Sequence, residues 1–127
     1  MSEEVNDLYT EIFMEIYSNP HNFGVLEDAD LISEDSNPLC GDKINLYIKI
    51  KDNKVVEVKY NGKGCAISMV SASLLTDHIK GMSIEQLKEI KPEEVIDLLK
   101  VPVGASRIKC ALLPLVVLRK ALKVYSN

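Results

Sequence analysis

The feature that most constrains the fold is a pair of strand-like segments on either side of a short polar turn. In KINLYIKI (43–50) every second residue is apolar, and KVVEVKYNG (54–62) follows almost at once. A period of two is typical of a strand with one buried face. Asp52 and Asn53 lie between the segments, and tight hairpin turns favour such residues. The pattern predicts an antiparallel hairpin with one face on the core.

Helical patterns surround this hairpin. Apolar residues at helical spacing predict a helix over 4–18, and a short edge strand is expected around 29–35. Further helices are predicted over 66–80, 83–90, 92–100 and 111–125, the second of them with a capping box of Ser83 and Gln86. The order of these elements predicts an α+β fold for a single domain over 1–127. It would have a small three-stranded antiparallel sheet with helices packed on one face.

Composition narrows the possible partners. The chain has 127 residues, a net charge of −4 and no basic block, which argues against nucleic-acid binding. The acidic start, MSEEVNDLY, has no apolar core of a signal peptide. The longest apolar run, 110–118, is about half the length needed to span a bilayer. We therefore expect a soluble cytoplasmic protein with no membrane partner.

Three cysteines lie at expected junctions between elements. Their odd number and the lack of a secretory signal argue against disulfides. Cys40 lies in the turn NPLCGDK, and Cys65 follows GKG directly before a predicted helix. Proline suits the first turn of a helix, so Pro114 predicts that the last helix begins near residue 111, with Cys110 at its N-terminus.

This placement suggests metal chemistry. Free N–H groups and the positive dipole at a helix N-terminus lower the pKa of a thiol, so Cys65 and Cys110 are expected to be thiolates. With Cys40, the carboxylate of Asp42 would complete the four ligands of a tetrahedral zinc or iron site. Because oxygen is a harder ligand than sulfur, such a site should hold an iron–sulfur cluster less firmly than four cysteines.

A simpler interpretation stays open on the residues alone. Free cysteine is among the most buried residue types, so all three could be packing residues. Their spacings of 25 and 45 residues match no compact metal motif. His21 and His78 are interpreted as a loop residue and a helix-end residue rather than ligands.

Three longer motifs favour the metal interpretation. NPLCGDKI (37–44), GKGCAISMVSASLLTDHIKG (62–81) and RIKCALLPLVVLRKAL (107–122) resemble the cysteine motifs of U-type iron–sulfur cluster assembly scaffolds. This is the IscU/SufU family, similar also to the N-terminal domain of NifU. The resemblance implies an IscU-like fold and the ligand set Cys40, Asp42, Cys65 and Cys110, with Gly41, Gly64 and Lys109 beside it.

The resemblance also implies a function. A [2Fe–2S] cluster would be built from iron and sulfur and then transferred to apo iron–sulfur proteins, without enzymatic turnover by the scaffold itself. Sulfur would come as a persulfide from a cysteine desulfurase of the IscS, SufS or NifS type. Cys110 is the favoured sulfur acceptor because Lys109 adds a positive charge beside it, and Cys40 is the rival. A monomer or weak homo-oligomer is expected.

Two departures leave the branch of the family open. Lys109 occupies the position where many IscU members have a histidine, which resembles SufU instead. Yet SufU members carry an insertion for which the spacing of 45 positions from Cys65 to Cys110 is too short. The main alternative function is therefore a zinc-bound sulfur-transfer partner that stimulates its desulfurase. A purely structural zinc site is a third interpretation, although such sites normally use closed Cys₄ or Cys/His ligation.

Overall fold

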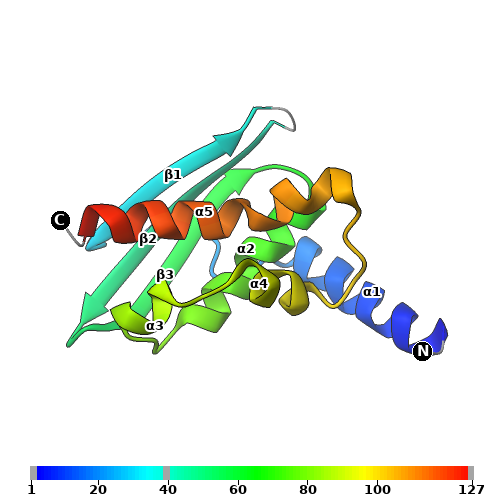
Figure 1. Ribbon diagram of the computed structural model, residues 1–127, viewed down its shortest axis with the longest axis horizontal. Coiled ribbons are helices and arrows are strands. Elements are labelled where there is room, and N and C mark those ends of the chain that lie inside the picture. The colour runs from blue at the N-terminus through cyan, green and yellow to red at the C-terminus, as the bar shows by residue number, and fades with distance from the viewer. Residues whose placement is uncertain (1–2, 39–40, 126–127) are drawn as a thin grey trace.

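The computed structural model describes residues 3–38 and 41–125 and has one small sheet covered by helices (Figure 1). Its elements, in chain order, are α1 (Glu3–Ser18), β1 (Leu31–Asn37), β2 (Asp42–Lys51), β3 (Lys54–Lys63), α2 (Ala66–Ile79), α3 (Ile84–Lys88), α4 (Pro92–Leu99), the 3₁₀ turn η1 (Ala105–Arg107) and α5 (Ile108–Tyr125).

The sheet has the order β1-β2-β3, and both strand pairs are antiparallel. The turn between β2 and β3 places both Asp52 and Asn53 at positive φ, +54° and +65°. Two such residues match the right-handed twist of a hairpin, which explains why this dipeptide joins the strands. The α+β fold and its three-stranded antiparallel sheet are confirmed.

One face of the sheet forms the core. Ile44, Leu46 and Ile48 on β2 are at most 4% exposed and alternate with partly or fully exposed residues. Helix α5 lies across β1 and β2, whereas α2 packs against β3 and α5 (Figure 1). Buried side chains of the sheet, α2 and α5 form the main hydrophobic cluster, together with side chains of α3 and α4. This face is the one that the strand pattern predicted to be apolar.

Short segments cover the outer edge of β3. The N–H of Tyr60 donates to the carbonyl of Asn22, and the N–H of Val55 donates to that of Met82, each at 2.9 Å. The first segment is also fixed to α2, because Asn22 Nδ2 and His21 Nδ1 contact the carboxylate of Asp77 at 2.8 and 2.6 Å. An edge protected in this way cannot pair with another strand at these positions.

The last helix differs from the prediction. It begins at Ile108, three residues earlier than expected, because η1 leads directly into it. Pro114 therefore lies inside α5 and cannot donate to the carbonyl four residues before it. Burial of Leu115, Val117 and Leu118, each at most 2% exposed, offsets this loss.

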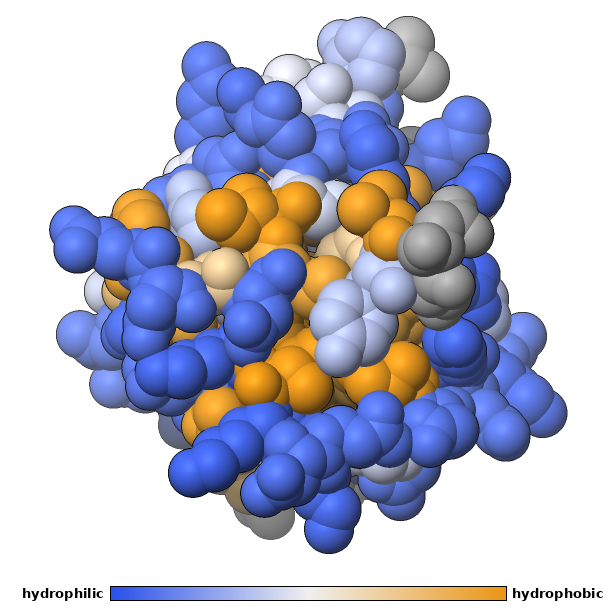
Figure 2. Space-filling model, turned by 90° about the vertical axis from the view of Figure 1, so that its left-hand side faces the viewer, coloured by the Kyte–Doolittle hydropathy of each residue, from blue (hydrophilic) through white to orange (hydrophobic). Residues whose placement is uncertain are grey.

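Different parts of the sheet and helices meet at the two ends of the molecule. The hairpin turn and the C-terminal end of α5 lie at one end, where apolar side chains are visible among polar ones (Figure 2). Val124, 72% exposed, belongs to this end of α5. The first residue of β2 and the first turn of α5 lie at the other end, beside the start of α2. None of the described helices is long and apolar enough to cross a membrane.

Candidate metal centre

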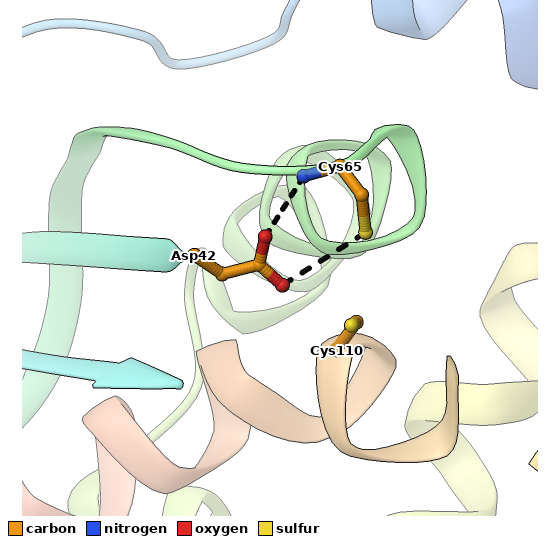
Figure 3. A group of neighbouring side chains, drawn as sticks. All are labelled: Asp42, Cys65 and Cys110. Carbon is orange, nitrogen blue, oxygen red and sulfur yellow. Dashed lines mark hydrogen bonds between the residues drawn. The ribbon is translucent and has the colours of Figure 1, made fainter. Parts of the chain in front are cut away.

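Three potential ligands converge from three elements. Asp42 is the first residue of β2, Cys65 is the N-cap of α2, and Cys110 is in the first turn of α5. One carboxylate oxygen and the two sulfurs all lie within 4.8 Å of one another (Figure 3). Residues separated by up to 68 positions in the sequence thus form one group, because the sheet and the two helices meet at this end.

The carboxylate of Asp42 is fully buried, at 0% exposure. Its Oδ1 accepts a 2.9 Å hydrogen bond from the backbone N–H of Cys65, and its Oδ2 lies 3.8 Å from Cys65 Sγ (Figure 3). A buried carboxylate is costly unless it is hydrogen-bonded or bound to a cation. The N–H at the start of α2 meets part of this need and turns Oδ2 toward the sulfurs.

Ser68 and Gly64 fit closely around this pair. The hydroxyl of Ser68 donates to the carbonyl of Cys65 at 3.0 Å, which holds the first turn of α2. A Cβ on Gly64 would lie 2.5 Å from Asp42 Oδ1 and 2.6 Å from Ser68 Oγ. No real side chain tolerates such distances, so only glycine lets the chain pass this close to the carboxylate.

The described residues before and after Cys40 are hydrogen-bonded to each other. Cys40 itself lies outside the described residues. Its neighbour Gly41 has φ +72°, a value that favours glycine, and donates its N–H to the carbonyl of Asn37 at 2.9 Å. Asn37 and Asp42 are also paired across β1 and β2. Chain connectivity therefore attaches Cys40 two residues from Asp42.

Arg107 is the residue at this site that the sequence did not single out. Interaction with Cys65 first, and also with Cys110, raises the pKa of the Arg107 guanidinium. The sequence could have indicated Arg107 through its position three residues before Cys110 at a helix start, because residues three positions apart lie on the same face of a helix.

The other predicted neighbours are placed differently. Lys109 is exposed and lines a groove with Pro38, Leu112 and Val116, between the end of β1 and α5. His21 is in the loop after α1, and His78 is in the last turn of α2, 3.7 Å from Glu94. Both histidines lie outside the group of potential ligands, as the sequence indicated.

The chemistry of the donor set fits a thiophilic metal. Two sulfurs and one carboxylate oxygen face a common point, and sulfur ligands select zinc or iron–sulfur clusters. Asp42 and Cys110 are fully buried, whereas Cys65 is partly exposed. Among the described ligands, a metal or cluster held here would be reached from the side of Cys65.

Known proteins are similar to this chain in both sequence and fold. The model of the NifU-like N terminal domain matches residues 8–127. The Archaeoglobus fulgidus iron–sulfur cluster assembly scaffold protein IscU 1 is 33% identical over 118 residues, covering 93% of this chain and 76% of that protein. The Bacillus subtilis zinc-dependent sulfurtransferase SufU is 44% identical over 81 residues, or 64% of this chain and 54% of that protein.

A solved structure has the same architecture. The crystal structure of a proposed iron–sulfur cluster assembly scaffold protein for the SUF system from Fervidobacterium islandicum superposes with a TM-score of 0.76. The two chains are 29% identical, and the match covers 92% of this chain and 98% of the other.

Proposed function

Because the chain belongs to the family of NifU-like N-terminal domains, with IscU and SufU scaffolds among its relatives, we propose that it assembles a [2Fe–2S] cluster as its cargo. The ligands are Cys40, Asp42, Cys65 and Cys110. The finished cluster is transferred to apo iron–sulfur proteins, and the protein has no turnover of its own.

The observation that carries this proposal is the convergence of Asp42, Cys65 and Cys110 within 4.8 Å. A purely structural core would not bring a fully buried carboxylate to two thiols, since the carboxylate carries a desolvation cost. Cys40, two residues from Asp42 on the same closed loop, supplies the fourth ligand. Four ligands with three sulfurs suit iron as well as zinc.

The same geometry supports transfer. Asp42 contributes the one hard ligand, which holds iron less firmly than a thiolate does. Cys40 belongs to a short loop whose described neighbours, Pro38 and Gly41, are exposed. Release through this loop leaves the buried ligands Asp42 and Cys110 in place for the next cluster. The partners are a cysteine desulfurase that supplies sulfur and the apo-proteins that accept the cluster.

Anaerobic reconstitution tests the proposal. The protein is incubated with Fe²⁺, L-cysteine, a cysteine desulfurase and a thiol reductant that converts persulfide sulfur to sulfide. We expect visible absorption of a [2Fe–2S] cluster and its transfer to an apo-ferredoxin. Omission of the desulfurase is the control. Protein that binds iron or zinc yet never forms a transferable cluster would contradict the scaffold function.

A second function has its own support. The 44% identity to a protein named as a zinc-dependent sulfurtransferase favours a zinc-bound sulfur-transfer partner of a desulfurase. Lysine rather than histidine before the third cysteine agrees with this alternative. In the same assay, zinc-loaded protein would then stimulate cysteine turnover by the desulfurase, and no cluster would form.

A further inference from the structure

We infer that the outer edge of β1 is a self-association surface. On it, β1 of a second copy of this chain pairs antiparallel, with the Ser33 residues of the two copies opposite each other. The inference does not depend on the proposed function, because it uses only the backbone and side chains of residues 32–34.

The two edges of the sheet are protected differently. Backbone segments cover the edge of β3, whereas no strand or bridge borders the outer side of β1 within the described residues (Figure 1). Lys120 reaches this edge from α5, and its Nζ donates to the carbonyl of Glu34 at 3.0 Å. A carbonyl has a second lone pair, so Glu34 can still accept from another strand. The β1 edge is therefore open to pairing.

The register of the sheet shows which backbone groups are directed outward on β1. Tyr60 on β3 bonds through its N–H and its carbonyl to the segment 22–24, so it does not bond to Leu46, its partner on β2. In an antiparallel sheet Leu46 then bonds to its other partner, Ser33 on β1. Orientation alternates along a strand, so the N–H and carbonyl groups of Ile32 and Glu34 are directed away from the sheet.

Two side chains at this edge are poorly accommodated in a single copy. Ile32 is 65% exposed, and an apolar residue on an open edge favours pairing with another strand. Ser33 is only 8% exposed, yet its hydroxyl has no hydrogen-bond partner within the described residues. Ser33 lines a hollow at the edge with Lys120 and Val124 of α5. A buried hydroxyl without a partner is unfavourable, so both residues would gain from a neighbouring strand.

Charge selects the register of the pair. With Glu34 on the twofold axis, the two Glu34 carboxylates would be directly opposite, and like charges in that position are destabilising. With Ile32 on the axis, Glu34 would be opposite Asp30, whose N–H already donates to the carbonyl of Ile48. With Ser33 on the axis, Ile32 of each copy lies opposite Glu34 of the other, and no acidic residues of 32–34 face each other.

This register also satisfies the groups that are unpaired in one copy. The outward backbone groups of Ile32 bond to those of Glu34 in the second copy, and the reverse. The Ser33 residues form the closely spaced kind of antiparallel pair, in which two hydroxyls can hydrogen-bond. Because only short segments meet, the association should be weak. Asn37, which pairs with Asp42, is at the end of β1, so the two candidate metal centres lie toward opposite ends of the joined sheet and away from the axis.

The test uses charge at position 32. Ile32→Glu places a carboxylate opposite Glu34 of the second copy, whereas Ile32→Lys places an ammonium there. Val56→Glu and Val56→Lys are the matched controls, since Val56 is 48% exposed on β3, at the other side of the sheet. Sedimentation velocity with a thiol reductant measures association from about 10 µM to about 1 mM protein. Circular dichroism checks the fold of every variant.

We expect the parent to dimerise with a dissociation constant on the order of 0.1–1 mM. Ile32→Glu should dimerise about tenfold or more weakly than Ile32→Lys, because the twofold axis repeats the repulsion. The two Val56 variants should agree within about twofold, since they change only the net charge. A parent that stays monomeric at about 1 mM would overturn the inference, as would Ile32 variants that differ no more than the Val56 pair.

A cross-link tests the register independently of charge. Ser33→Cys, mildly oxidised, should form a disulfide between the two copies at position 33, identified by mass spectrometry of the linked peptides. Ser36→Cys is the control, because this exposed residue lies opposite Asp30 in the inferred register. If the Ile32 variants do not fold, this comparison decides. Linking at position 33 in excess of position 36 supports the inference, and linking at position 36 as readily as at 33 overturns it.

Discussion

The backbone N–H of Cys65 donates a 2.9 Å hydrogen bond to Oδ1 of Asp42, so the start of α2 is joined to the start of β2 through a carboxylate with no solvent exposure. This bond fixes the orientation of the proposed hard ligand. Asp42 thus has a role in the fold beside its proposed role as a metal ligand, and substitutions can separate the two.

Asp42→Ala and Asp42→Asn form the first pair. Both remove the charged oxygen ligand, the hard ligand to which the family resemblance assigns the lability of the cluster, so a reconstituted cluster should be longer-lived in air and slower to transfer. Alanine also leaves the Cys65 N–H without its acceptor and should lower the free energy of unfolding of the metal-free protein by about 1–3 kcal/mol. Asparagine can retain this acceptor and should cost less. A cluster lost faster from both variants than from the parent would contradict the assignment of Asp42.

The cysteines provide the second prediction. Cys40→Ala, Cys65→Ala and Cys110→Ala should each abolish stable metal binding, because each removes a sulfur ligand, which holds zinc or iron more firmly than the carboxylate does, and no spare thiol replaces it. Metal stoichiometry after desalting is the measurement, with Ser106→Ala, an exposed change in η1, as the control. Any cysteine variant that keeps full stoichiometry and affinity identifies a residue that is not an obligatory ligand.

Gly64→Ala should disturb the site without removing a ligand. The new methyl group would lie 2.5 Å from Asp42 Oδ1, so the carboxylate or the chain must shift. We expect a loss of about 1–3 kcal/mol in stability and weaker Zn²⁺ binding. Gly104→Ala is the matched control, since its Cβ meets nothing within 4 Å and its φ is −68°. Equal stability of the two variants in urea denaturation would show that the close approach is unimportant.

Asp77 provides a prediction on pH. Partial burial would raise the pKa of this carboxyl, but hydrogen bonds from His21 and Asn22 outweigh it and lower the pKa. Because the folded-state pKa lies below the unfolded value, Asp77 stabilises the fold at pH above that unfolded value, about 4. This contribution is lost as the pH falls through the folded-state pKa.

The comparison is between the parent, Asp77→Asn and Asp97→Asn. At pH 6 the parent should exceed Asp77→Asn by up to about 1 kcal/mol in the free energy of unfolding, a small value because the side chain of Asp77 is 41% exposed. The difference should shrink in acid. Asp97→Asn, an exposed change on α4, removes the same charge outside this network. A difference that stays constant with pH would contradict the role of the Asp77 carboxylate.

The first acceptor of sulfur stays a prediction. The sequence favours Cys110, with Lys109 and a helix N-terminus beside it, and Cys40 is the rival. The Cys110 thiol is fully buried, so a desulfurase reaches it only if this end of the protein opens. We expect the first persulfide on Cys110 in metal-free protein treated with desulfurase and cysteine. Mass spectrometry of alkylated peptides that finds label on Cys40, with Cys110 unmodified, would show that access outweighs thiolate character.

The sequence by itself determined the elements and the ligand types. Alternation in 43–50, the pair Asp52–Asn53 and the capping box at Ser83 are local signals, and local backbone preferences explain why β2, β3 and α3 occur where they do. The resemblance of the cysteine motifs supplied the family. Pro114 misled the prediction of the start of α5, because a proline preference is weak against the burial of a whole helix face.

Only the tertiary structure decided how these residues meet. No local pattern specifies that the start of β2, the N-cap of α2 and the first turn of α5 converge, since their approach depends on packing between layers distant in the sequence. The same packing buries Cys110 and places Lys109 beside a groove between the end of β1 and α5. Burial and electrostatic contact are properties of the assembled layers, and they are what assign each residue at the site its role.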